Sequence, residues 1–204
     1  LINAHAIETA TWLGVQSPTV HRISGVHRGP GAARHRQAEA VFDRNRLIIE
    51  AESKKPSPYQ LTLRGERDGS VVTGVVGLAG PRDASLRLQV VVAERGVLFP
   101  GTSEIVIHRM LARGRVFEPV QGIPCQPLAG RFVRPFSIDL EAIAERNAAF
   151  LDDLESSGAG AVTRLSTAID PAQVVLVATL RDERTGGVVQ ATQLAPAPRE
   201  GPQG

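Results

Sequence analysis

Tyr59-Gln60-Leu61-Thr62-Leu63-Arg64 and Val71-Val72-Thr73-Gly74-Val75-Val76 are the two stretches that decide the fold of this 204-residue chain. In the first, polar and apolar side chains alternate with a period of two, which is the pattern of a half-buried β-strand. Asp68-Gly69 lies between the two stretches, and this dipeptide favours the positive φ angles of a tight hairpin turn. Together they predict an antiparallel hairpin.

Further strands are predicted on the C-terminal side of this hairpin. Leu86, Leu88, Val90 and Val92 share one face of a strand at 86–93. The other predicted strands cover residues 105–111, 132–138, 174–180 and 188–194. Gly- and Pro-containing turns at this spacing favour an antiparallel, Ig-like β-sandwich over a parallel sheet. One helix interrupts the strands at 139–155, with Ser137 or Asp139 as its N-cap and its end near Gly158.

The N-terminal quarter mixes helical and strand patterns. Residues 1–13 have helical apolar spacing, and a strand, a Ser24-Gly25 turn and a short strand follow Pro18. A second helix at 32–53 carries an approximate apolar stripe and ends before Pro56. The stripe is formed by Ala38, Val41, Phe42, Ile48 and Ile49. We expect an α/β segment at 1–55, the sandwich at 56–194 and an extended tail at 195–204.

The composition excludes several classes of function. The 23 basic and 21 acidic residues are intermixed and leave a net charge of +2, so nucleic acid is not an expected partner. The longest apolar run is about seven residues, against the roughly 20 that a membrane-spanning helix needs. Cys125 is the one cysteine, which excludes an intrachain disulfide, a CxxC redox pair and a thiolate zinc cluster.

Three groups of segments resemble, in order and spacing, the outer-membrane-protein-28-like family of bacterial extracytoplasmic proteins. Residues 15–20 are similar to a thioredoxin-fold loop that carries a cis proline. Residues 91–101 and 108–111 are similar to a hairpin of the β domain, and residues 169–191 are similar to the closing hairpin of that domain. The resemblance implies a partial thioredoxin-like domain followed by an Ig-like β domain, in a periplasmic or otherwise extracytoplasmic, membrane-peripheral location. It also implies a cis peptide bond at Ser17-Pro18.

One departure from that family bears on function. The strand and helix that would carry the redox CxxC are absent, and Cys125 lies far along the chain in the Pro-flanked segment 122–127. Thiol–disulfide exchange needs an activated thiolate and a resolving cysteine, so this chemistry does not carry over. Cys125 is expected to be a packed thiol.

The histidines and the acidic residues form no recognisable metal or catalytic motif. His21, His27 and His35 are spaced by six and eight residues, which fits no standard zinc pattern even with Asp43 added. His108 has no evident nucleophile or carboxylate partner. The acidic residues Asp152, Asp153 and Glu155 lack the alternating ligands of a calcium loop. No catalytic, cofactor or metal site is therefore predicted.

We expect a non-catalytic subunit that docks on a larger extracytoplasmic protein assembly, such as a photosynthetic or respiratory electron-transfer complex. The chain starts at Leu1 without Met, which we interpret as a processed or incompletely represented product. One alternative is a thioredoxin-fold oxidoreductase whose redox half lies outside this chain. Another is a carbohydrate-binding sandwich, which would have only Trp12 and Tyr59 for stacking on sugars. The tail from Ala195 is expected to be ordered only against another polypeptide.

Overall fold

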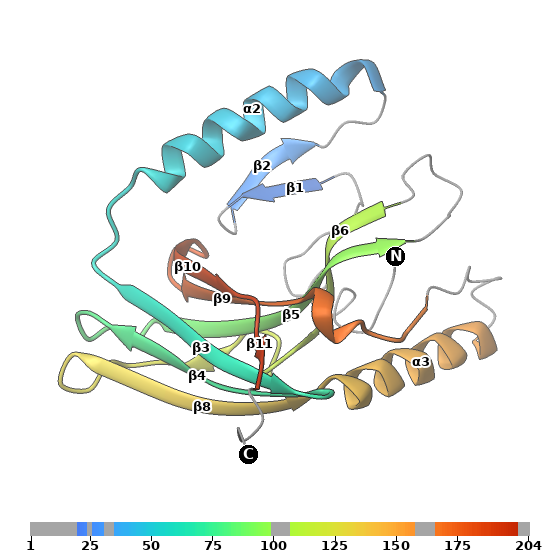
Figure 1. The fold of residues 1–204 in the computed structure, drawn as a ribbon. Helices are drawn as coiled ribbons and strands as arrows, with labels where there is room; N and C mark the ends of the chain where they lie inside the picture. The colour runs from blue at the N-terminus through green and yellow to red at the C-terminus, as the bar shows by residue number, and fades with distance from the viewer. Residues whose placement is uncertain (1–19, 24–25, 31–34, 99–106, 158–165, 200–204) are drawn as a thin grey trace.

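The computed structural model describes residues 20–23, 26–30, 35–98, 107–157 and 166–199. Two β-sheets pack on each other, and two long helices lie outside them (Figure 1). The mainly β fold agrees with the sequence prediction, and the two described helices correspond to those predicted at 32–53 and 139–155. The helix predicted at 1–13 lies outside the described residues. None of the described helices is both long and apolar enough to cross a membrane.

The first sheet, called here the β3 sheet, has the strand order β11-β3-β4-β8. The predicted hairpin forms it: β3 (Gln60–Asp68) pairs antiparallel with β4 (Val71–Ala79) over nine residue pairs. Gly69 has a φ of 58°, as the Asp68-Gly69 turn requires. β8 (Arg131–Asp139) adds antiparallel to β4.

The second sheet, called here the β5 sheet, has the order β10-β9-β5-β6. Its long central strand β5 (Leu86–Leu98) pairs antiparallel with β6 (Ile107–Arg115), β9 (Val174–Asp182) and the short β7 (Ile123–Pro124). β10 (Val188–Leu194) pairs antiparallel with β9. All the pairs among the predicted sandwich segments are antiparallel, as expected.

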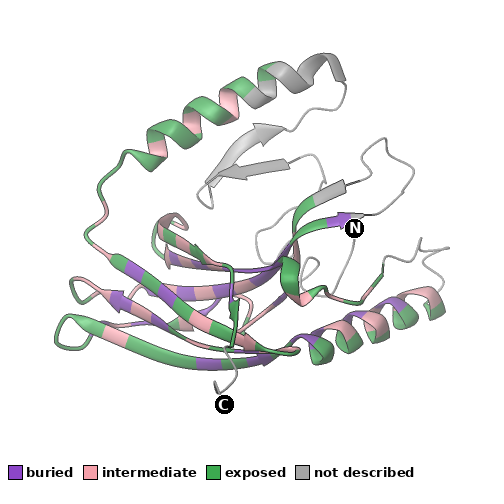
Figure 2. Ribbon diagram, in the orientation of Figure 1, coloured by how far each residue is buried: buried purple, intermediate pink, exposed green. Residues whose placement is uncertain are grey.

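The core lies between the two sheets, where alternating side chains of both meet. Its fully buried members include Val72, Val76, Leu88, Val92 and Leu176. Buried residues therefore alternate with intermediate or exposed ones along much of β3 and β4, which Figure 2 shows as purple bands between pink and green ones. Burial of this apolar area is the main stabilising contribution.

The helix α3 (Leu140–Ser156) begins where β8 ends, close to the predicted range. Asp139 is its N-cap, since the Asp139 carboxylate accepts a hydrogen bond from the Glu141 backbone N–H, so Asp139 rather than Ser137 has this role. Leu140, Ile143 and Leu151 are buried and attach the helix to the sandwich. A single 3₁₀ turn (Pro171–Gln173) leads from the following connection into β9.

The N-terminal segment contains the expected hairpin of β1 (Val20–Ile23) and β2 (Val26–Pro30), followed by α2 (His35–Ser53). The predicted apolar stripe of α2 is not fully covered, since Ile49 is 54% exposed and its neighbour Leu47 is 59% exposed. The expected cis proline, Pro18, lies outside the described residues. The thioredoxin-like origin of this segment remains a prediction.

The expectation for the tail was wrong over residues 195–199. Pro196 is buried, and β11 (Ala197–Pro198) pairs in parallel with Glu66 and Arg67 of β3. The Arg199 backbone N–H donates to the Arg67 carbonyl, 2.7 Å away, and its side chain lies 3.4 Å from Glu66. The chain's own sheet edge thus orders this part of the tail without another polypeptide, because β3 offers unpaired backbone groups there.

Candidate functional site

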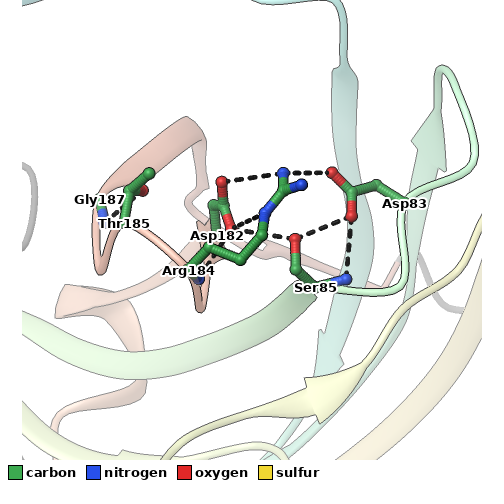
Figure 3. A network of polar contacts seen from close by, with 6 residues as sticks. All are labelled: Asp83, Ser85, Asp182, Arg184, Thr185 and Gly187. Carbon is green, nitrogen blue, oxygen red and sulfur yellow. Dashed lines mark hydrogen bonds and ion pairs between the residues drawn. The ribbon is translucent and has the colours of Figure 1, made fainter.

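The turns β4–β5 and β9–β10 are joined by a polar network, called here the clasp, of Asp83, Ser85, Asp182 and Arg184 (Figure 3). Arg184 Nη2 lies 2.8 Å from Asp83 Oδ2, and Arg184 Nε lies 3.1 Å from Asp182 Oδ1. The Ser85 hydroxyl lies 2.8 Å from Asp83 Oδ1 and 2.9 Å from Asp182 Oδ1. Residues about 100 positions apart in sequence are thereby fixed together.

Each aspartate of the clasp also shapes its own turn. Asp83 Oδ1 accepts from the Ser85 backbone N–H, and Asp182 Oδ1 accepts from the Arg184 backbone N–H, both at 2.9 Å. Such bonds to the residue two positions on define Asx turns, which are local and depend only on nearby sequence. The Asp-x-Ser and Asp-x-Arg spacings were a signal that the sequence interpretation missed.

The clasp keeps both of its carboxylates ionised. Hydrogen bonds from the Ser85 backbone and then its hydroxyl lower the pKa of Asp83, and the Arg184 side chain is the main cause that lowers the pKa of Asp182. The same pairing raises the pKa of Arg184. These hydrogen bonds and ion pairs make the clasp an ordered network of fixed charges at the surface.

Acidification is expected to weaken the clasp. Aspartates in the unfolded chain titrate near pH 4, while Asp83 and Asp182 titrate lower in the folded protein. Below about pH 4 the unfolded state therefore binds more protons, and their contribution to stability is lost as the pH falls through the folded pKa values. Asp182→Asn should lower stability at pH 7 and flatten the decline between pH 5 and pH 2, measured by urea unfolding. Parallel pH curves for the variant and the wild type would contradict this expectation.

Beside the clasp lies a cleft of about 330 Å³ between the end of α2, the following turn and β10. Its wall is partly apolar, from Pro56, Leu86 and Val189, and partly polar, from Lys55 and the clasp. Tyr59 lines it and is half-buried; burial, and then the charge of Asp83, raises the pKa of its hydroxyl. A cleft of this size and mixed character can hold a few side chains of a partner.

Cys125 lies next to the two-residue strand β7, which the sequence interpretation missed, and is completely buried. Burial raises the pKa of its thiol to about 12, with a smaller opposing effect of Arg87. The folded protein therefore holds Cys125 as a neutral thiol at neutral pH, as expected for a packed rather than a reactive residue.

We predict that Cys125 does not react with an aromatic disulfide reagent at pH 8 until the protein unfolds. Because the thiol pKa is higher in the folded state than in the unfolded state, stability is unaffected at neutral pH and falls as the pH rises above about 9. Thiol titration with and without guanidinium checks this. Stoichiometric reaction of the native protein within minutes would contradict it.

The remaining candidates from the sequence are distributed over several elements. His108 lies on β6 opposite Val97, while His21 and His27 lie on β1 and β2 and His35 begins α2. Asp152, Asp153 and Glu155 occupy the last turn of α3. Within the described ranges, no group of three or more His, Cys, Asp or Glu residues is arranged to hold a metal ion.

A second polar cluster, which the sequence interpretation also missed, is buried where β5, β6 and α3 meet. Glu94 Oε2 lies 3.0 Å from Arg113 Nε, and these side chains are only 7% and 3% exposed. Arg113 Nη2 donates to the carbonyls of Ser166 and Ala168, at 2.9 and 2.5 Å. The Asn147 amide donates to the Arg113 carbonyl at 2.9 Å.

This buried pair connects four parts of the chain. Glu94 Oε1 also accepts from the Asp170 backbone N–H at 3.1 Å, so the connection leading to β9 is held from both sides. Burial, opposed by the charge of Glu94, lowers the pKa of Arg113, although arginine stays charged at any accessible pH. The two charges are enclosed and 3.0 Å apart, but Glu94 Oε2 and Arg113 Nε do not form a hydrogen bond with each other. Charge attraction and the hydrogen bonds to the backbone therefore give the cluster a structural role.

Comparisons with known proteins support the fold. No family model and no curated protein sequence matches the chain. Among solved structures, HBP35 of Porphyromonas gingivalis is similar with a TM-score of 0.65 and 12% identity. The match covers 98% of this chain and 60% of that protein. A domain of the outer membrane lipoprotein Omp28 from the same organism has a TM-score of 0.44 and 12% identity over 72% of this chain and 93% of that one. At this identity, the likeness to HBP35 shows a shared fold.

Proposed function

We propose that this chain is a non-catalytic accessory subunit of an extracytoplasmic bacterial protein assembly, and that the clasped end of its sandwich contacts the partner. The observation that carries the proposal is the position of Arg184. Its side chain is 67% exposed, yet two carboxylates hold its guanidinium in one orientation. An exposed arginine that is already ordered loses little side-chain entropy when it binds.

The composition of the clasped end fits a protein partner. Arg184 lies beside the half-buried Tyr59, and tyrosine and arginine are enriched among residues that dominate binding energy at protein interfaces. The apolar wall of the cleft, including Val189, gives a place for a partner's side chain next to these polar groups.

The strand order supports an Ig-like type of sandwich. In an Ig domain, the first, second and fifth strands belong to one sheet, and the third, sixth and seventh to the other. Here β3, β4 and β8 share one sheet, and β5, β9 and β10 share the other, with β6 beside β5. In this correspondence the clasp joins the two loops that, in antibody variable domains, belong to the binding end.

The extracytoplasmic location rests on the resemblance of the sequence to the outer-membrane-protein-28-like family. The fold likeness to HBP35, a bacterial protein, is consistent with it. Membrane-attached electron-transfer complexes belong to the class of assembly that we propose, and they define a narrower hypothesis for the same experiment.

Site-specific photocrosslinking in the cells that produce the protein tests the proposal. A benzoylphenylalanine at the exposed Arg82, next to Asp83 in the clasped end, is expected to form a discrete adduct with another envelope protein. The same amino acid at the exposed Glu145 of α3 is the control and should not form this adduct. Adding Arg184→Ala to the Arg82 variant should reduce the adduct. Equal adducts from both positions, or none from Arg82, would contradict the proposal.

A further inference from the structure

The outer face of the β3 sheet, which points away from the core, carries an exposed apolar centre. Val133 of β8 is 64% exposed and Val75 of β4 is 39% exposed, and Pro135 beside Val75 is exposed as well. Gly77, opposite Val133, adds no side chain to the centre. Val75 and Pro135 line an open depression of about 760 Å³, together with polar residues such as Arg64 and Glu66. Neither α2 nor α3 lies over this face in Figure 1, where β8 forms its lower border.

Charged residues on the same face are separated along the strands. The residue pairs of the sheet place Arg131 at the end near the β4–β5 turn, and Asp68 and Asp139 together at the opposite end. Between them, Arg64 lies level with Pro135, and Glu66 lies one step closer to the acidic end. The face therefore runs from basic through apolar to acidic.

We infer that a second copy of this chain packs on the outer face of the β3 sheet, with the two copies related by a twofold axis that crosses the strands at Val75. This symmetry places the basic end of each copy against the acidic end of the other, so Arg131 faces Asp139 twice. It also brings together the two apolar centres. Each Arg64 faces the Arg64 of the second copy, and the second copy's Glu66 lies one step away. A twofold interface must be complementary to itself, and the two Arg131–Asp139 contacts at its ends satisfy that condition.

The edge strand excludes a different mode of pairing. A second copy could add to β8 edge to edge, as exposed strands often do. Pro135 lies at the middle of β8, and proline has no N–H to donate to an added strand. Packing through the face, rather than through the edge, is the arrangement that this strand permits.

The size of the face predicts a weak dimer. Three strands about 4.8 Å apart, nine residues long at about 3.4 Å per residue, cover roughly 400 Å² per copy. Stable interfaces bury about 800 Å² per partner, so the two copies should separate on dilution. This interface is on a different surface from the clasp and does not depend on the proposed partner.

Sedimentation equilibrium of the purified protein, from about 5 to about 500 µM, tests the inference, and a concentration-dependent dimer is expected. Val133→Glu should raise the dissociation constant about tenfold or more, because it places two carboxylates in the apolar centre. Leu47→Glu is the matched control, since Leu47 is 59% exposed but belongs to α2 rather than to the β3 sheet, and it should leave the constant unchanged.

Charge-reversal variants distinguish this twofold arrangement from other modes of dimerisation. Arg131→Glu should weaken the dimer, and Asp139→Lys added to it should restore association, because the two residues face each other across the interface. Circular dichroism confirms that each variant is folded, since Asp139 also caps α3. A monomer at every concentration, an equal effect of Val133→Glu and Leu47→Glu, or no restoration by the double variant would overturn the inference.

Discussion

Arg113→Met is expected to lower the free energy of unfolding by about 3–5 kcal/mol, the range for breaking a buried ion pair. The substitution removes the partner of Glu94 and leaves its carboxylate, only 7% exposed, without a countercharge. It also removes the hydrogen bonds to the carbonyls of Ser166 and Ala168. Guanidinium unfolding followed by circular dichroism measures the loss. Arg46→Met, which breaks an exposed pair with Glu50 on α2, is the control and should cost no more than about 0.5 kcal/mol.

The pair itself, rather than the volume of Arg113, is tested by a double variant. Glu94→Leu combined with Arg113→Met should be more stable than Arg113→Met alone, because no unpaired charge is then buried. Recovery should be partial, since the Asp170 N–H loses the acceptor Glu94 Oε1. A double variant less stable than the single one, or an Arg113→Met cost no larger than that of Arg46→Met, would show that the pair contributes little.

Glu94 also illustrates how far the sequence could predict this cluster. The apolar face of the predicted strand continues through Leu86, Leu88, Val90 and Val92, and the next residue of that phase is Glu94. A charged residue on the buried face of a strand requires a partner, so the sequence contained a signal for a buried countercharge. It could not identify Arg113, because that pairing depends on the register of β6, which shifts between Val92 and Ala93.

The strands and α3 were predictable because their signals are local. The alternation at 59–64, the Asp68-Gly69 turn and the Asp139 cap each act within a few residues. The clasp and the place of the tail depend instead on segments distant in sequence: Arg184 meets Asp83, and Ala197 pairs with Glu66. Such contacts depend on how the two sheets pack together, which local sequence patterns do not specify. The apolar spacing of α2 likewise did not reveal that Ile49 would be exposed.

Gly74→Ala is expected to destabilise the protein by about 3 kcal/mol, near the upper end of the range for overpacked cores. Gly74 lies on the inner side of β4, opposite Gly65 and Phe136. A Cβ atom there would lie 2.3 Å from the Arg64 carbonyl oxygen and 2.5 Å from Phe136 Cζ. The Phe136 ring packs edge-to-face on Phe117, with centroids 6.4 Å apart, so it cannot move aside freely.

Gly77→Ala is the matched control for this prediction, because both glycines belong to β4. Its Cβ would come within 2.7 Å only of the Thr62 hydroxyl, a side chain that can rotate on the outer face. Replacing glycine by alanine in a strand restricts the unfolded chain and by itself stabilises by about 0.4–1 kcal/mol. Gly77→Ala should therefore be nearly neutral, while Gly74→Ala is strongly unfavourable. Urea unfolding of the two variants measures the difference, and equal stabilities would show that the β3 sheet yields to an added methyl group near Phe136.

Combining Gly74→Ala with Phe136→Leu should recover only part of the lost stability, because the Arg64 carbonyl belongs to the backbone and stays in place.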